Sequence, residues 1–364
     1  MATTVTRSNT KVSRLAAQMG CEIAEGVYPA GSMLPPEREL ARRYGVSPTT
    51  LRKCLGLLTD RGHLVRHPNR GVVVAERPEG GARVGQIAFV SPMLSSDAVP
   101  YIRGLTGGID HDRFSLATYI TQADMNQYRR VIENIPRTGP VGAVIWVPFE
   151  DLCPIHDECF AGARFPIVTL GQHPLPHVAA DNVRDCPVDA AVKVARRIAA
   201  GGCRRPAFVG AVSRRLSEEQ IQTLRRELGP HGIGLPDERV FVVDTPRGFG
   251  LSPDPYSDVH DFVADLLARG LDCDCLICGH DYPAVGALRA LAEFGIRVPD
   301  AMKVISLCRT GVERTASPRL TTVDIHNEQQ ARKAAELLIR RIDGHKGYPE
   351  IHYVSTELIE GETA

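Results

Sequence analysis

A short run of hydroxyl and basic residues, at the start of one predicted helix, has the chemistry needed to contact nucleic acid. Ser47, Thr49 and Thr50 open the segment SPTTLRKCLGLL, and Arg52 follows two residues later. Hydroxyls and the free N–H groups of a helix N-terminus bind phosphate oxygens, and an exposed arginine can donate to O6 and N7 of guanine. This pattern is typical of a helix that enters the major groove of DNA.

Basic residues on either side of this helix extend the same surface. We expect Arg38, early in the preceding helix, to hold a flanking phosphate. We expect the same of Arg70, which lies between His67 and Gly71 in a later predicted hairpin. Taken singly, a basic residue such as Arg42 is better explained as a solvated surface group. The whole set, rather than any one member, therefore predicts DNA binding.

The elements that must position these residues can be read from periodicity and capping. Ser47 suits an N-cap and Pro48 the first helical position. The sequence predicts helices over residues 11–26, 36–45 and 47–62, then two short strands around a turn at 68–71. This order is that of a helix-turn-helix followed by a β-wing.

The charge balance separates this segment from the rest of the chain. The 364 residues have zero net charge, but residues 1–76 hold 11 Lys+Arg against 6 Asp+Glu, leaving 32 against 37 elsewhere. A basic head on an acidic body indicates a polyanionic partner. The N-terminus lacks the apolar core of a secretory signal, and no apolar run reaches the roughly 18 residues of a membrane span. We expect a cytoplasmic protein with reduced cysteines.

The pattern changes after RPEGGAR, which we interpret as a linker over residues 77–83. Apolar runs such as VGQIAFV, FSLATYI, VGAVIWV and CDCLIC then alternate with helical stretches. Alternation of strand and helix predicts parallel sheets covered on both faces, and the length of this part suggests two lobes. The predicted fold class is multi-domain: a winged helix-turn-helix over residues 1–76, then a two-lobed α/β domain over 84–364.

Three closely spaced cysteines, Cys273, Cys275 and Cys278, raise the possibility of a metal site. Alternation on a strand would place Cys273 and Cys275 on one face and Cys278 on the other, so we interpret them as buried side chains. We expect no metal and no cofactor. The chain also lacks a G-x-S-x-G elbow, an H-E-x-x-H pair, a P-loop and a G-x-G-x-x-G motif, and we expect no enzymatic activity.

The N-terminal segment resembles a known family of DNA-binding domains. GSMLPPERELARRYGVSPTTLRKCLGLLTDRGHLVRHPNRGVVV resembles the GntR-family winged helix in its Leu-Pro-x-Glu-Arg-x-Leu-Ala run, its Val-Ser-x-x-Thr-Leu-Arg start and its Arg-Gly wing tip. The resemblance covers about residues 8–76. It implies DNA contacts by the following residues: Arg38, Ser47, Thr49, Thr50, Arg52, His67, Arg70 and Gly71. Pro48 and Asn69 depart from the family pattern, which leaves the base preference open.

The remainder of the chain, from about residue 84 to 360, resembles the ligand-binding domain of LacI-family regulators, which is similar to periplasmic sugar-binding proteins. DNVRDCPVDAAVKVARRIAAGGCRRPAFVGA, CDCLICGHDYPAVGALRALAEFGIRVPDAMKVISL and ASPRLTTVDIHNEQQARKAAELLIRRIDG carry it. The resemblance implies two lobes joined by three crossovers, with a small effector, such as a sugar, at the carboxyl ends of the strands. It also implies a homodimeric repressor of operator DNA.

Candidate ligand contacts follow from this resemblance and from the strand ends. They are Ser91, Trp146, Arg214, Phe249, His280 and Asp281. Asp281 matches the acid of the family's Asn-Asp pair, with His280 in place of the Asn, and it could equally cap the next helix. Trp146 could stack on a sugar or belong to the core. A transport-type sugar-binding protein is the alternative function, and the DNA-binding head argues against it.

Overall fold

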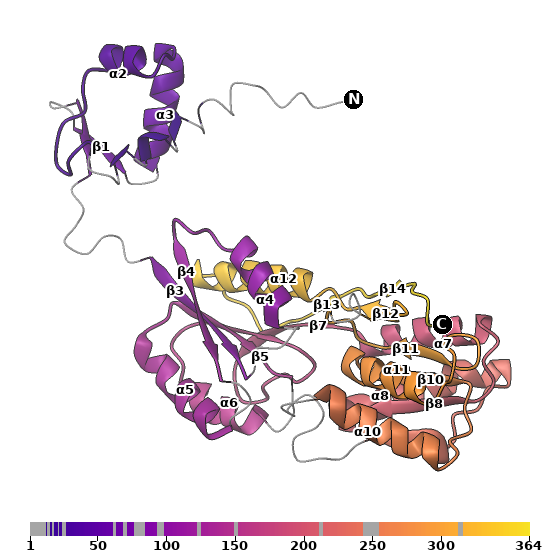
Figure 1. Cartoon of the computed structure of the whole chain (residues 1–364). Helices are drawn as coiled ribbons and strands as arrows, with labels where there is room; N and C mark the ends of the chain where they lie inside the picture. The colour runs from indigo at the N-terminus through magenta and orange to yellow at the C-terminus, as the bar shows by residue number, and fades with distance from the viewer. Residues whose placement is uncertain are drawn as a thin grey trace. The chain divides into compact units, whose positions relative to one another are not determined.

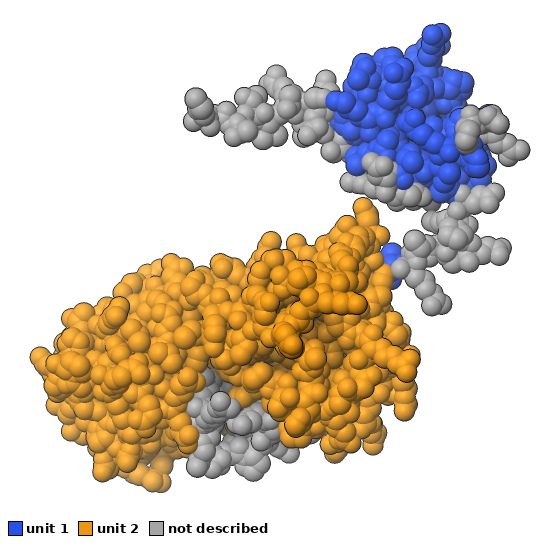
Figure 2. Space-filling view, turned by 180° about the vertical axis from the view of Figure 1, so that it is seen from behind, with its two compact units in different colours: residues 1–84 blue, residues 85–364 orange. Residues whose placement is uncertain are grey.

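The computed structural model describes residues 12, 15–16, 18–20, 22–23, 27–60, 63–67, 71–75, 84–92, 98–121, 125–148, 152–210, 214–242, 255–311 and 316–364, without the side chains of residues 60, 125, 214–216 and 255. The chain divides into two compact units, residues 1–84 and 85–364, which are blue and orange in Figure 2. The predicted linker, Arg70 and Phe249 lie outside the described residues.

Unit 1 is a helical domain closed by a hairpin (Figure 1). Its elements are α2 (Glu37–Arg43), α3 (Pro48–Asp60), β1 (Leu64–His67) and β2 (Gly71–Val74). The strands are antiparallel, and Met33 forms a bridge to Val73 on the outer side of the hairpin. The helix-turn-helix and wing predicted from the sequence are therefore present, although Pro36 precedes α2 as its N-cap instead of lying inside it.

The core of unit 1 follows the predicted periodicity of the helices. Leu15 and Met19, from the helical residues that precede α2, pack with Leu51, Leu55 and Leu58 of α3, and all of these side chains are buried. Burying one such aliphatic side chain contributes about 1.5–3 kcal/mol. One face of α3 is thereby fixed against the domain, and its opposite face is left to solvent.

The first lobe of unit 2 is built on an entirely parallel six-stranded sheet of order β13-β7-β6-β5-β3-β4. Its strands are β3 (Gly85–Ser91), β4 (Phe114–Ile120), β5 (Gly142–Trp146), β6 (Ile167–Leu170), β7 (Ala180–Asp185) and β13 (Ile351–Val354). Helices α4 (Ala98–Gly108) and α12 (Asn327–Ile342) pack on one face. Helices α5 (Met125–Thr138) and α6 (Cys153–Phe160) pack on the other.

The second lobe repeats this architecture with the strand order β14-β12-β11-β10-β8-β9, in which only β14 is antiparallel to its neighbour. Its strands are β8 (Pro206–Gly210), β9 (Val240–Val242), β10 (Cys275–Cys278), β11 (Lys303–Ser306), β12 (Thr321–Asp324) and β14 (Glu357–Ile359). Helices α7 (Pro187–Ala200) and α8 (Arg214–Leu228) cover one face. Helices α10 (Pro255–Ala268) and α11 (Asp281–Glu293) cover the other.

The chain passes between the lobes at three places, after β7, after β12 and after β13. Each crossing leaves the carboxyl end of a strand, so the carboxyl ends of both sheets lie at the boundary between the lobes. This is the edge at which open α/β sheets bind their ligands. The predicted fold class, a winged helix-turn-helix followed by a two-lobed parallel α/β domain, is confirmed.

Three strands and one helix were not foreseen from the sequence: β7, β13, β14 and α6. The predicted arrangement of the cysteines is also partly wrong. Cys275 packs in the core beside α7 and α8, whereas Cys273 and Cys278 pack in the core beside α10 and α11. Cys273 precedes the first residue of β10, so the alternation of a strand does not apply to it. Among the helices of the described residues, none has the length and apolar character to cross a membrane.

Candidate functional site

The start of α3 is organised by its own hydroxyl groups. The backbone N–H of Thr50 donates to Oγ of Ser47 at 3.2 Å, and the two hydroxyls lie 2.9 Å apart. Ser47 is thus the predicted N-cap, and Pro48 is the first helical residue. A cap of this kind stabilises the helix by about 1 kcal/mol and fixes the direction in which its first turn points.

The exposed side of α3 presents the remaining polar residues. Thr49 is exposed, and the side chain of Arg52 is 64% exposed. Nε of Arg52 donates to Oε2 of Glu37, in the first turn of α2, at 2.9 Å. An exposed pair of this type contributes about 0–1 kcal/mol, so it holds Arg52 over the helix-turn-helix without locking it there.

The other predicted DNA contacts flank this surface. Arg38 of α2 and His67 at the end of β1 are exposed. Gly71 opens β2 with φ of 83°, a backbone conformation that glycine adopts without strain. Arg70 lies between His67 and Gly71 in the sequence, outside the described residues. The structure therefore places every described member of the set on the surface of unit 1, with Thr50 half-buried.

A polar cluster that the sequence did not predict fixes the end of α2. Oη of Tyr44 donates to Oε2 of Glu22 at 2.6 Å and lies 2.8 Å from Oη of Tyr28. The guanidinium of Arg43 lies over both tyrosine rings, 5.3 and 5.7 Å from their centroids. Burial, followed by the bond to Glu22, raises the pKa of Tyr44. These contacts tie the helical residues before α2 to the turn that presents α3.

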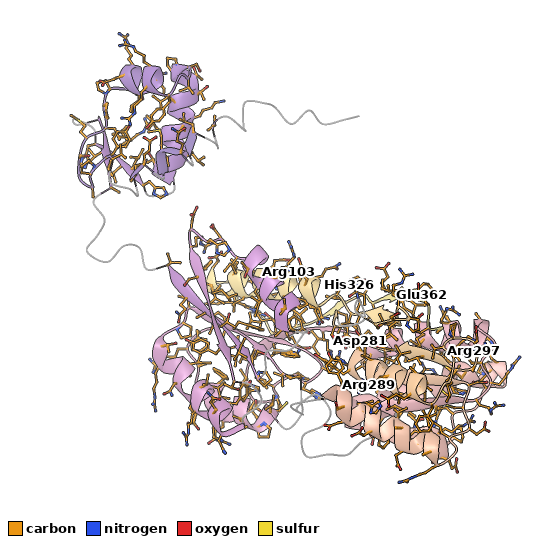
Figure 3. All side chains as sticks on the ribbon, viewed as in Figure 1. Arg103, Asp281, Arg289, Arg297, His326 and Glu362 are labelled. Atoms are coloured by element: carbon orange, nitrogen blue, oxygen red, sulfur yellow. The ribbon has the colours of Figure 1, made fainter. Side chains whose placement is uncertain are left out.

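In unit 2, Asp281 lies at the start of α11, on the side of the second lobe next to the first (Figure 3). Its side chain is fully buried. Oδ1 accepts hydrogen bonds from Oγ of Ser306 at 2.6 Å and Oγ1 of Thr322 at 2.9 Å, and Oδ2 accepts from the N–H of Thr310 at 2.8 Å. His280, not Asp281, is the N-cap residue, so the predicted capping role is wrong. The carboxylate instead joins the end of β11 and the interior of β12 to α11.

His280 is half-buried beside two tyrosines. Its ring stacks on Tyr282 with centroids 5.0 Å apart and planes 2° from parallel, and Tyr282 meets Tyr256 edge-on at 5.2 Å. Burial lowers the pKa of His280 to about 4, so the imidazole is neutral at neutral pH. A neutral imidazole can donate from one nitrogen and accept at the other, which matches a hydroxyl group.

The other predicted ligand contacts divide between the strand ends and the core. Ser91 is buried at the end of β3. Trp146 is 6% exposed and packs in the core against α4 and α12, with its ring 5.5 Å from that of Tyr101. The core interpretation of Trp146 is therefore the one that its position favours. Arg214 begins α8, but its side chain and Phe249 lie outside the described set.

A buried acid lies at the first crossing between the lobes. Nε2 of Gln172 donates to Oδ1 of Asp185 at 2.7 Å and to its backbone oxygen at 3.2 Å. Burial raises the pKa of Asp185 to about 6. The third crossing is held by Thr356, whose Oγ1 donates to Oδ2 of Asp189 at 2.6 Å. Both crossings are thus tied by polar contacts to the segments beside them.

Sequence reasoning missed the hydroxyl residues that surround Asp281 and the tyrosines beside His280. The available signal was position, because Ser306 ends β11 and Thr310 follows it. Within the described part of the chain, no three His, Cys, Asp or Glu side chains are grouped to hold a metal ion.

Comparison with known proteins identifies both units. Residues 11–74 match the family model for bacterial regulatory proteins of the gntR family, and residues 195–364 match that for the periplasmic binding protein-like domain. The chain is a transcriptional regulator. It joins a GntR-family DNA-binding domain to a periplasmic-binding-protein-like domain of the kind found in LacI-type regulators.

Relatives of this GntR/LacI-type regulator are themselves regulators. It is 21% identical over 350 residues to an arabinose metabolism transcriptional repressor from Halalkalibacterium halodurans, covering 92% of this chain and 90% of that protein. It is 33% identical over 159 residues to the regulator GalR of Lacticaseibacillus casei, covering 42% and 45% of the two chains. The structure of a transcriptional regulator CelR-cellobiose complex superposes with a TM-score of 0.65 at 20% identity, over 91% of this chain and all of the other.

Proposed function

We propose that this GntR/LacI-type regulator binds operator DNA as a homodimer and that a small polar ligand, a sugar or sugar derivative, binds between its lobes and changes its affinity for the operator. One arrangement carries the proposal. A capped helix with an exposed polar face shares a chain with two parallel sheets whose carboxyl ends meet at the crossings between the lobes. The first feature suits the major groove, and the second suits a bound ligand.

The DNA contacts follow from the chemistry of each side chain. Arg52 is the candidate for base contact, because its guanidinium is exposed near the start of α3. Ser47, Thr49 and Thr50 would place their hydroxyls and backbone N–H groups against phosphates. Arg38 in α2 and the wing residues His67, Arg70 and Gly71 would hold the flanking backbone. Two such heads in a dimer require two half-sites related by a two-fold axis.

The ligand contacts are proposed for the lobe boundary. The residues are Ser91, Arg214, Phe249, His280 and Asp281, whereas Trp146 is assigned to the core. Neutral His280, which stacks on Tyr282, can exchange hydrogen bonds with a hydroxyl. Asp281 would act mainly by holding β11 and β12 against α11, since its oxygens already accept three protein hydrogen bonds. A sugar is favoured by the resemblance to LacI-type regulators and by the names of the relatives.

Regulation would come from the difference in ligand affinity between two states of the lobes. A ligand can change operator affinity by no more than that difference, typically about 1–3 kcal/mol, or roughly 5- to 150-fold. We propose a repressor that its ligand releases from DNA, that acts in the cytoplasm and that catalyses no reaction. The segment RPEGGAR between the units is predicted to be a linker without periodic structure, so coupling would depend on the spacing of the two heads in the dimer.

The test is capture of operator fragments from genomic DNA by the purified full-length protein, followed by titration of the captured site with a panel of mono- and disaccharides present. The proposal expects a site with two-fold symmetry, bound by a dimer, and at least one sugar that shifts its affinity. Captured DNA without a shared symmetric sequence would overturn the DNA-binding part. If no sugar shifts operator affinity or protein stability, the ligand class is wrong.

A further inference from the structure

A groove of about 460 Å³ lies on the first lobe, away from the strand ends discussed above. It runs between the segment 174–179, which leads into β7, and the residues that begin β13. Figure 1 shows β13 beside β7, and β13 is the last strand of its sheet. The groove thus lies at the amino ends of these strands, whereas the proposed sugar site lies at carboxyl ends.

The register of the sheet shows which face the groove occupies. Asp181 of β7 is paired with Arg341 of α12, so its side chain points to the face that α12 covers. Asn182 is the next residue, and it lies opposite Ile351 of β13 in a parallel ladder. Successive side chains alternate, so Asn182 and Ile351 point to the other face. Ile351 is 49% exposed, which shows that this edge of the face is open.

Asn182 supplies the groove with a buried acceptor. Asn182 is 1% exposed and is one of the residues that line the groove. Its Nδ2 donates to the carbonyl oxygen of Gly171 at 3.1 Å and to Oγ1 of Thr169 at 2.9 Å. Because the carbonyl oxygen of Gly171 can only accept, the atom facing it must be the amide nitrogen, and this fixes the orientation of the Asn182 amide. Oδ1 is left without a partner among the described residues. A buried unpartnered acceptor is costly, and a donor in the groove would satisfy it.

The other groups of the groove define the ligand chemistry. Glu350 brings a half-exposed carboxylate, whose oxygen lies 3.2 Å from Nε2 of His352. Leu175, Val178 and Ile351 supply apolar walls. The groove therefore offers oxygen acceptors, one of them a carboxylate, between apolar walls. The charge of Glu350 disfavours an anionic ligand and suits a cationic N–H donor, and the apolar walls suit a hydrocarbon body. We propose that it is a second ligand site, which takes an amine carried on a compact apolar body.

This inference goes beyond the proposed function and does not depend on it. The experiment uses methyl NMR of the full-length protein with two probes, cyclohexylmethylamine and cyclohexanecarboxylate, at a pH above the ordinary pKa of histidine. The amine should shift the methyl signals of Leu175, Val178 and Ile351 and reach saturation in the millimolar range that its size allows. The carboxylate should leave these signals in place. Equal shifts with both probes, or no saturable shift with the amine, would overturn the proposal.

Variants locate the probe in the groove. Ala179→Phe fills the groove at an exposed position and should abolish the saturable shift. Glu350→Gln removes one partly exposed charge and should lower the affinity for the amine by about two- to fivefold. Tyr348→Ser is the matched control, because Tyr348 is 92% exposed and does not line the groove. Amine binding that survives Ala179→Phe unchanged would remove the groove as the site.

Discussion

Oγ of Ser306, the last residue of β11, donates to Oδ1 of Asp281, the first residue of α11, at a distance of 2.6 Å. Together with the bonds from Thr310 and Thr322, this contact lets one buried carboxylate join the end of β11, the segment that follows it and the interior of β12 to the start of α11. The carboxyl end of β11 and the start of α11 lie at the lobe boundary. The shape of the proposed ligand site on the second lobe therefore depends on Asp281 even if no ligand touches it.

Asp281→Ala should destabilise the second lobe. It leaves three donors without their acceptor, and we expect a loss of roughly 3 kcal/mol or more in the free energy of unfolding. Differential scanning calorimetry should show a lower transition for unit 2, while operator affinity stays near wild type because the head is a separate unit. The response to an effector should be lost. A variant with wild-type stability and response would show that Asp281 holds nothing at this boundary.

Arg52→Ala should weaken operator binding by about 1–3 kcal/mol and reduce discrimination against scrambled DNA, because a base contact is lost. The melting temperature should hardly change, since the exposed pair with Glu37 contributes little. Arg70→Ala is the comparison. It should weaken binding to all DNA sequences alike and lower the salt dependence of that binding. Fluorescence anisotropy titrations at several salt concentrations distinguish the two. Unchanged operator affinity for Arg52→Ala would contradict its role.

The buried acid at the first crossing predicts a pH dependence of stability. Burial raises the pKa of Asp185 from 3.8 to about 6. Between these two values the folded state holds the proton more tightly than the unfolded state, so this group makes stability fall as pH rises from about 4 to about 6. Below that window both states are protonated, and above it the loss is constant.

Asp185→Asn should remove this dependence, because the amide keeps an acceptor for Gln172 and does not ionise. The difference in free energy of unfolding between the variant and wild type should therefore change with pH. From about pH 4 to neutral pH it should shift by about 2–3 kcal/mol in favour of the variant. Urea denaturation at a series of pH values measures the difference. Parallel stability curves for the two proteins would mean that Asp185 titrates normally in the fold.

The packing of α4 on α12 predicts a sharp difference between two glycines. A Cβ on Gly104 would lie 2.3 Å from the backbone oxygen of Glu328, so Gly104→Ala should force the helices apart and cost about 1–3 kcal/mol. Gly162→Ala is the control, since nothing lies within 4 Å of its added Cβ. Trp146, the one tryptophan, packs in the same core and reports unfolding of this lobe by fluorescence. Equal stability of both variants would refute this close packing.

Local sequence determined the DNA-binding head almost completely. The N-cap, the first-turn proline and the apolar spacing of Leu51, Leu55 and Leu58 act within a few residues of one another, and α3 begins where they place it. Most strands of the two lobes were likewise marked by their own apolar runs. The predicted motif residues Thr49 and Arg52 are exposed because the helix period puts them opposite the buried face.

Tertiary structure decided what local patterns do not contain. Strand β7, with the sequence ADNVRD, is too polar to stand out, and it forms because β6 and β13 pair with it on either side. The partners of Asp281 lie 25, 29 and 41 residues away along the chain. Such contacts depend on how strands are ordered in a sheet, and a sequence period reports only which face a residue occupies, not which distant residue shares that face.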